Sequence, residues 1–122
     1  MHCTASGRSL LFDSSDEVVE VLTAVDLLAP TFGPSAPRDL DELLHRLRRE
    51  RERGYALASE EVEIGLTSIG MPVRDHSGEL VAVVNISGAT SRMITRVDEI
   101  ALRLRAGVAS LEAALAKPYT RP

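Results

Sequence analysis

The sequence has no tryptophan, two tyrosines, two phenylalanines and one cysteine among its 122 residues. So few aromatic side chains argue against a platform on which nucleic-acid bases could stack. The single cysteine, Cys3, excludes a disulfide framework and a zinc site built from cysteines. The formal net charge of −4 argues against an autonomous nucleic-acid-binding protein, because no uncompensated basic face is available to neutralise phosphates.

Long apolar runs and catalytic motifs are also missing. No window approaches the length of a membrane span, and the N-terminus MHCTASGRSLL lacks the basic and apolar regions of a signal peptide, so we expect a soluble, cytoplasmic protein. The sequence has no G-x-S-x-G, no phosphate-binding glycine loop and no paired histidines of a zinc enzyme. Because His2, His45 and His76 lie in unrelated contexts, we expect no metal and no cofactor.

The chain nevertheless has the composition of a globular domain. Hydrophobic residues make up 44% and charged residues 26%, and 122 residues suit one domain with a real core. Apolar periodicity, caps and turn residues predict the elements. These are short helices over 4–12 and 13–22, a loop over 27–39, a helix over 39–54, a hairpin of strands 66–73 and 79–88, and a long helix over 95–116 that Pro118 ends. This order predicts an α+β domain with helices against an antiparallel sheet.

The segment DLDELLHRLRRERERG is the clearest helix, because its leucines recur at helical spacing. Asp39 and Glu42 fit a capping box, and Gly54 suits the C-terminal cap. The arginines alternate with glutamates at i,i+4 spacing, as in Glu42–Arg46 and Arg46–Glu50. We therefore expect a solvated face of compensated charges rather than a phosphate-binding patch.

The hairpin has one apolar face and one face that becomes small and polar. The apolar face is predicted from Ile69, Met71 and Val73 of the first strand and Leu80, Ala82, Val84 and Ile86 of the second. On the opposite face, antiparallel pairing brings Ser68 close to Asn85 and Ser87. Small hydrogen-bonding side chains on a sheet leave room for a ligand, while an ordinary solvated face is the alternative.

Three acids, Glu60, Glu61 and Glu63, precede the hairpin. They could act as general acids or as ligands of a hard cation, but they lack the spacing of a calcium loop. We expect a solvated acidic turn that leads into the sheet.

Two segments resemble a known family. RGYALASEEVEIGLTSIGMPVRDHSGELVAVVNISGATSR closely resembles the signature of IclR-type bacterial transcriptional regulators, and HCTASGRSLL resembles the family's His-x-Thr-Ala-x-Gly-Lys-Ala-Leu-Leu segment. The resemblance covers essentially the whole chain. It implies a GAF-like effector-binding domain, an antiparallel sheet flanked by helices, that binds small organic acids or aromatic metabolites and is not an enzyme. It also implies a partner winged helix-turn-helix domain that binds DNA as a dimer or tetramer.

The resemblance implies a ligand pocket. The matching positions are Ala5, Ser6, Leu66, Ser68, Asn85 and Ser87. Ser68 stands where a cysteine is frequent in the family, Asn85 where a serine is, and Ala58 where many members have an acid. No winged helix precedes Met1, so we expect residues 1–122 to be a partial effector-binding domain, incomplete on its N-terminal side.

The expected function is therefore effector sensing and oligomerisation, with a small carboxylic or aromatic acid as ligand. Free N–H groups from Thr4 to Gly7 would hold the carboxylate. Operator DNA would bind through the winged helix of the parent protein and not through this chain. Uncovered strands and apolar faces would drive a homo-oligomer, a dimer or tetramer. An enzyme using Glu60 or Glu61 and an oligomerisation module without a ligand are the alternatives.

Overall fold

Three antiparallel strands lie at the centre of the computed structural model, which describes residues 1–28 and 32–116. The elements of this described part follow one another in this order: α1 (Ala5–Leu10), α2 (Asp16–Leu28), α3 (Leu40–Arg53), β1 (Ala56–Ser59), β2 (Leu66–Arg74), β3 (Leu80–Ala89), α4 (Thr90–Met93) and α5 (Val97–Leu115). The sheet order is β1-β2-β3. The expected α+β class with helices flanking an antiparallel sheet is confirmed. No helix in these two ranges is long and apolar enough to cross a membrane.

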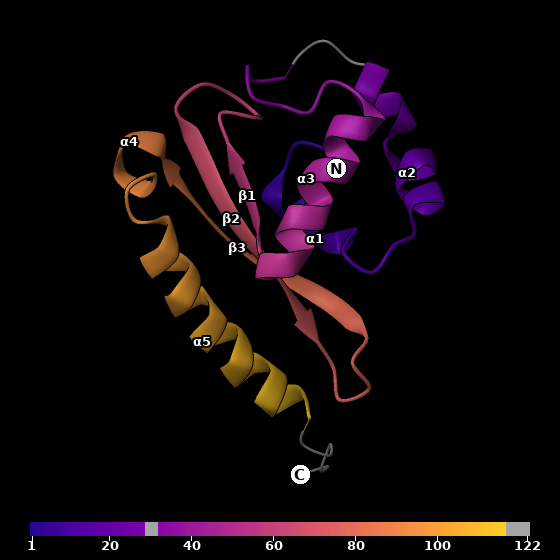
Figure 1. Cartoon of the computed structure of the whole chain (residues 1–122). Helices are drawn as coiled ribbons and strands as arrows, with labels where there is room; N and C mark the ends of the chain where they lie inside the picture. The colour runs from indigo at the N-terminus through magenta and orange to yellow at the C-terminus, as the bar shows by residue number, and fades with distance from the viewer. Residues whose placement is uncertain (29–31, 117–122) are drawn as a thin grey trace.

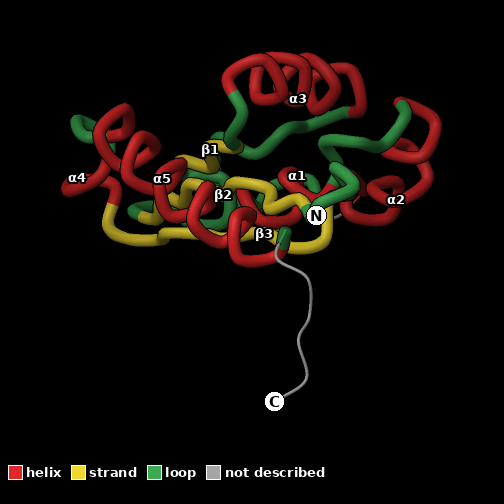
Figure 2. The backbone as a smooth tube through the Cα atoms, turned by 90° about the horizontal axis from the view of Figure 1, so that it is seen from below, coloured by secondary structure: helices red, strands yellow, loops and turns green. Residues whose placement is uncertain are grey.

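The helices form two layers, one on each face of the sheet. Helix α5 runs along one side, while α1, α2 and α3 lie on the other (Figure 1). Seen after a quarter turn, α1 lies beside the strands and α3 lies on the outside of its layer (Figure 2). Each face has its own apolar core.

The face toward α5 is in most positions the one that strand alternation predicted. Ile69, Met71 and Val73 of β2 are buried there and pack with α5, whose stripe of Val97, Ile100, Ala101, Leu104 and Val108 faces them. Leu80 is an exception, because it packs against the other core, and Ala82 and Ile86 are exposed. The predicted stripe of α5 extends further than the sheet can cover. Leu111 and Leu115 are each 47% exposed, which agrees with the expectation of apolar faces that the sheet leaves uncovered. The expected helix stop at Pro118 lies outside the described residues.

The caps of α3 match the sequence prediction. The Asp39 side chain accepts a hydrogen bond of 2.8 Å from the backbone N–H of Glu42, and Gly54 ends the helix in the left-handed region with φ 90°. Glycine carries no Cβ penalty there. In a capping box the Glu42 side chain would accept a hydrogen bond from the backbone N–H of Asp39. Here its carboxylate accepts instead from the backbone N–H of Arg38 at 3.0 Å.

Strand β1 was not predicted. The sequence indicated a two-stranded hairpin, whereas Ala56–Ser59 adds a third strand that pairs with β2 from Ala56↔Gly70 to Ser59↔Thr67. The four residues ALAS contain no β-branched or aromatic side chain, so their intrinsic strand preference is weak. Pairing with β2 and burial of Ala56 and Ala58 against the helical layer decide the conformation.

Helix α2 presents apolar residues to solvent. It buries Val19 and Thr23, and its outer stripe consists of Val18, Val21, Leu22, Val25 and Leu28. Within this stripe Val21, Val25 and Leu28 are 76%, 80% and 84% exposed. Contiguous exposed apolar side chains of this kind mark an interaction surface more often than a plain solvated face.

Candidate ligand-binding site

A polar cluster lies on the sheet face that carries α1. The antiparallel register places Ser68 of β2 directly opposite Ser87 of β3, and their hydroxyl oxygens are 2.7 Å apart. The side-chain amide of Asn85 donates to the Ser87 hydroxyl at 3.0 Å. Asn85 and Ser87 are exposed, and Ser68 is half-buried. The three side chains that alternation assigned to one face therefore do meet.

The start of α1 crosses the sheet next to this cluster. A Cβ built on Gly70 would lie 2.7 Å from the Ala5 carbonyl oxygen, so glycine lets the helix approach β2 this closely. Gly70 is two residues from Ser68 and its Cβ direction points to the same face. Ser6 follows Ala5 in the first turn, and Leu66 precedes Ser68 by two residues on that face.

The N-terminal turn of α1 offers fewer free donors than the sequence predicted. The Thr4 hydroxyl accepts a hydrogen bond of 2.9 Å from the backbone N–H of Gly7, and Arg8 N–H donates to the Thr4 carbonyl. A carboxylate at this helix end would therefore meet the N–H groups of Ala5 and Ser6, not that of Gly7.

Two cavities lie elsewhere, and none of the six predicted residues lines either of them. One, of about 300 Å³, lies between α2, the segment before α1 and residues 32–38. The other, of about 220 Å³, lies between α3 and β1 and is lined by Arg46, Arg49 and Arg53 together with Glu50 and Glu61. The polar cluster is thus on an open face of the sheet.

A buried ionic cluster behind α1 escaped the sequence prediction. Arg8 is fully buried and donates to Glu50 at 2.8 and 2.9 Å and to Glu61 at 2.5 and 3.0 Å. Its guanidinium also donates to the carbonyl oxygens of His2 at 3.1 Å and Leu57 at 2.7 Å. This cluster of Arg8, Glu50 and Glu61 connects α1, α3 and the turn after β1.

The acidic turn is therefore only partly solvated. Glu61 is 2% exposed and binds Arg8 and Arg46, which corrects the expectation of a solvated lead-in. Glu63 is exposed as expected. Glu60 has a positive φ of 60°, and its carboxylate accepts from the Gly65 N–H at 2.5 Å. The two acids that an enzyme would have used hold structural contacts instead.

Ion pairing along α3 also differs in part from the i,i+4 pattern. Glu42 and Arg46 do pair, with 3.3 Å between nitrogen and oxygen. Glu50 lies in the Arg8 cluster and accepts from the Leu57 N–H at 2.9 Å, so the predicted Arg46–Glu50 pair does not form. A buried carboxylate is stabilised best by several donors held in fixed geometry, which Arg8 and a backbone N–H provide.

The electrostatics of the cluster favour structure over acid–base chemistry. Burial raises the pKa of Glu61, and the hydrogen bonds and charge of Arg8 oppose this rise without cancelling it. Burial lowers the pKa of Arg8, but its hydrogen bonds to Glu50 and Glu61 outweigh burial, so the pKa is raised and the guanidinium stays charged. The charged guanidinium of Arg8 thus holds both Glu50 and Glu61 in fixed positions within the fold.

An antiparallel sheet with helices on both faces and a cluster of small polar side chains on one face is an arrangement that can accommodate a small ligand. The profile of the family described as "Bacterial transcriptional regulator IclR C-terminal" matches residues 1–113. The chain belongs to this family.

Individual relatives agree with this membership. The HTH-type transcriptional repressor AllR of Salmonella typhi is 35% identical over 94 residues, which are 76% of this chain and 34% of the relative. The chain thus spans about a third of the length of the curated relatives it matches. The IclR of Thermotoga maritima superimposes with a TM-score of 0.80 at 33% identity, covering 95% of this chain and 47% of that one. The inducer-binding domain of PobR from Acinetobacter, in a complex with 3-hydroxybenzoic acid, gives a TM-score of 0.78 at 26% identity and covers 91% and 64%.

Proposed function

We propose that this chain is the ligand-sensing and oligomerisation domain of an IclR-type transcriptional regulator, and that a small organic or aromatic acid is its effector. The observation that carries the proposal is the cluster of Ser68, Asn85 and Ser87 beside the first turn of α1. Effector binding would modulate DNA binding by a winged helix of the parent protein.

The chemistry of the cluster suits a carboxylate. Hydroxyl and amide groups and the N–H groups of Ala5 and Ser6 are donors, and none of the six predicted residues carries a negative charge. Leu66 and Val83 are half-buried apolar residues that can contact the body of the ligand. The PobR neighbour, whose inducer-binding domain is in complex with 3-hydroxybenzoic acid, makes an aromatic acid a sensible first candidate.

The test is a titration with small carboxylic and aromatic acids, followed by variants. In Asn85→Ala/Ser87→Ala we expect the binding free energy of an acid found in this way to weaken by about 1–3 kcal/mol, which is about fivefold to a hundredfold in Kd. The matched control is Ser110→Ala, an exposed serine on α5, which covers the other face of the sheet. Unchanged affinity in the double variant would mean that the site is placed wrongly.

A non-catalytic role is part of the proposal. Glu60 and Glu61 are engaged with Gly65 and with Arg8 and Arg46, so neither is available as a general base. Incubation of the protein with any acid that it binds, followed by chromatography, should recover the acid unchanged. Turnover that disappears in Glu61→Gln would favour the enzyme instead.

Self-association through α2 is supported by its outer stripe. Covering the side chains of Val21, Val25 and Leu28 would remove their apolar area from water, at about 25 cal/mol per Å². We expect a dimer or larger assembly in sedimentation, and dissociation in Val21→Gln/Val25→Gln. Ile64→Gln, at an 81% exposed position away from α2, is the control and should associate like the wild type. A monomer at every concentration would contradict the proposal.

A further inference from the structure

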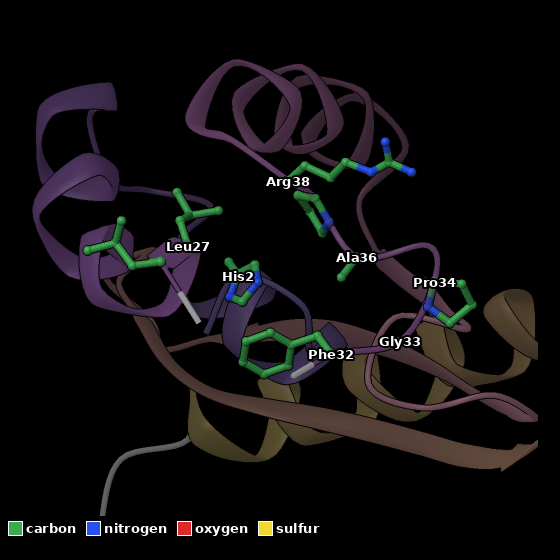
Figure 3. Close-up of a pocket in the computed structure, with 9 residues that line it drawn as sticks. His2, Leu27, Phe32, Gly33, Pro34, Ala36 and Arg38 are labelled. Carbon is green, nitrogen blue, oxygen red and sulfur yellow. The ribbon is translucent and has the colours of Figure 1, made fainter. Parts of the chain in front are cut away.

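The cavity of about 300 Å³ lies in the helical layer and is built from other elements than the polar cluster. Its walls come from the end of α2, from residues 32–38 and from the segment before α1. Leu27 and Phe32 lie on either side of the His2 ring, and Pro34 lies at the far end of the cavity (Figure 3). Most of the lining residues have apolar side chains, while backbone groups of residues 32–38, His2 and Arg38 add polar surface. The volume is at the lower end of ligand pockets, which suits a molecule of about one aromatic ring.

The wall that contains Phe32 is anchored to the rest of the fold. The backbone N–H of Gly33 donates to the Glu61 carbonyl at 2.8 Å, and Ser35 N–H donates to the Glu60 carbonyl at 3.0 Å. A Cβ on Gly33 would lie 2.4 Å from the Glu60 carbonyl oxygen, so the loop and the turn after β1 are in close contact. These contacts hold the cavity wall in place before any ligand arrives.

His2 is the polar group of this cavity. It is 2% exposed, and its Nδ1 has no hydrogen-bond partner in the described part of the chain. The ring meets Phe32 edge to face, with 4.6 Å between centroids and 83° between planes. The nearest carboxylate oxygen, Oδ2 of Asp26, is 4.0 Å from Nδ1 and beyond hydrogen-bond range. A buried polar atom without a partner destabilises the fold, and a ligand group that bonds to it could recover part of that loss.

The charged groups beside His2 largely compensate one another. Burial lowers the pKa of His2, so the imidazole is neutral at neutral pH. The carboxylate of Asp26, 4.0 Å from Nδ1, is paired with the N-terminal ammonium of Met1 at 2.9 Å, so the pair presents little net charge to a ligand. Arg38, also in the lining, is exposed at the mouth of the cavity. A hydroxyl group matches a neutral imidazole in either tautomer, because it both donates and accepts.

We propose that this cavity is a second ligand site, separate from the sheet cluster, for a small uncharged molecule that combines an apolar body with one hydroxyl group. The hydroxyl would bond to Nδ1 of His2, and the body would lie against Phe32 and Leu27. The proposal goes beyond effector sensing at the sheet and does not depend on it, because the two sites share no residue.

Phenol is the probe, and the histidine side chains report its binding. The chain has three histidines, and exposed His45 and His76 serve as internal references in a ¹⁵N spectrum of the imidazole nitrogens. Phenol should shift the Nδ1 signal of His2 saturably and leave the other two histidines unmoved. Benzene, which lacks the hydroxyl, and benzoate, which is charged, should bind about tenfold or more weakly. Equal or tighter binding of benzoate, or no His2 shift with phenol, would overturn the proposal.

Variants separate this site from the other. Ala36→Phe places a ring in the cavity and should abolish the phenol response, as judged on a protein whose circular dichroism is native. Leu28→Ala removes a wall, whereas Val25→Ala trims the same helix outside the cavity, so only the first should weaken phenol binding. This pair decides the question if Ala36→Phe does not fold. Asn85→Ala/Ser87→Ala should leave the phenol response intact, and identical responses in all variants would refute the site.

Discussion

Replacing Arg8 by methionine is the most informative perturbation of this fold. The variant retains much of the side-chain volume but removes every guanidinium donor. Glu50 would keep the Leu57 N–H at 2.9 Å, and Glu61 would keep Arg46 at 2.8 Å. Both carboxylates would then be buried with fewer hydrogen-bond donors and less positive charge beside them than in the wild type. Removing one partner of a buried ion pair costs about 3–5 kcal/mol, a large part of the about 5–15 kcal/mol that stabilises a domain.

The free energy of unfolding that Arg8→Met loses should be smaller at acidic than at neutral pH. Burial already raises the pKa of Glu61, and losing the opposing interaction with Arg8 would raise it further. A carboxyl whose pKa is higher in the folded than in the unfolded state binds more protons when folded between those two values. Its contribution to stability is therefore present below the unfolded pKa and is lost as pH rises through the folded pKa. The difference between Arg8→Met and wild type should be smaller at about pH 5 than at about pH 7.5.

Urea unfolding followed by circular dichroism measures these differences, since the chain has no tryptophan. Arg103→Met is the matched control. Arg103 is 78% exposed on α5 and pairs with Glu99 at 3.4 Å, so its loss should cost less than about 0.5 kcal/mol. Adding Glu50→Gln and Glu61→Gln to Arg8→Met should restore stability, because no buried charge then lacks a partner. A cost below about 1 kcal/mol for Arg8→Met, or a triple variant less stable than the single one, would refute the reasoning.

Further changes test single contacts. Gly70→Ala would force a Cβ to 2.7 Å from the Ala5 carbonyl oxygen and should cost at least about 1–3 kcal/mol in urea unfolding. Gly107→Ala, where a Cβ would meet nothing within 4 Å in the middle of α5, should instead stabilise by about 0.5–1 kcal/mol. The two hydrogen bonds that Arg74 donates to Asp13 lower the pKa of Asp13. At pH values above the pKa of Asp13 in the unfolded chain, Asp13→Asn should therefore cost up to about 1 kcal/mol of stability. This difference should vanish as the pH falls through the pKa of Asp13 in the folded protein. In gel-shift assays the chain alone should bind DNA weakly, without sequence preference, and progressively less as salt rises, and a sequence-specific shift would contradict this.

Local patterns predicted the elements in which neighbours along the sequence decide the structure. The leucine stripe of α3, its Asp39 cap and its Gly54 terminator all act within one or two helical turns. Gly78 of the hairpin turn has the positive φ, 84°, that its position required. Alternation along β2 and β3 likewise predicted the face of Ser68 and Ser87, and their cluster follows from this parity. It failed for Leu80, because a register shift between Val73 and Arg74 moves this residue to the other core. That the cluster binds a ligand stays a prediction.

Elements that depend on distant partners were beyond such patterns. The four residues of β1 become a strand because β2 is available to pair with them. Their own sequence has little strand preference and does not indicate a partner about ten residues away. The cavity at His2 depends on where the loop of residues 32–38 meets the turn after β1. Neither periodicity nor composition encodes the space left between them.

The ionic cluster shows most clearly what a local interpretation of charge misses. Arg8 is 42 residues from Glu50 and 53 from Glu61, whereas Arg46 lies one helical turn from Glu50 and looked like its natural partner. The signal that could have found the cluster lies in the segment ASGRSLL, where one arginine interrupts a helix of small and apolar residues. An arginine in such a helix cannot be buried without carboxylates, so its presence requires acids from elsewhere in the chain. Glu50 of α3 and Glu61 meet that requirement, and for this reason the turn after β1 holds one buried carboxylate, Glu61, where its sequence alone indicated solvent.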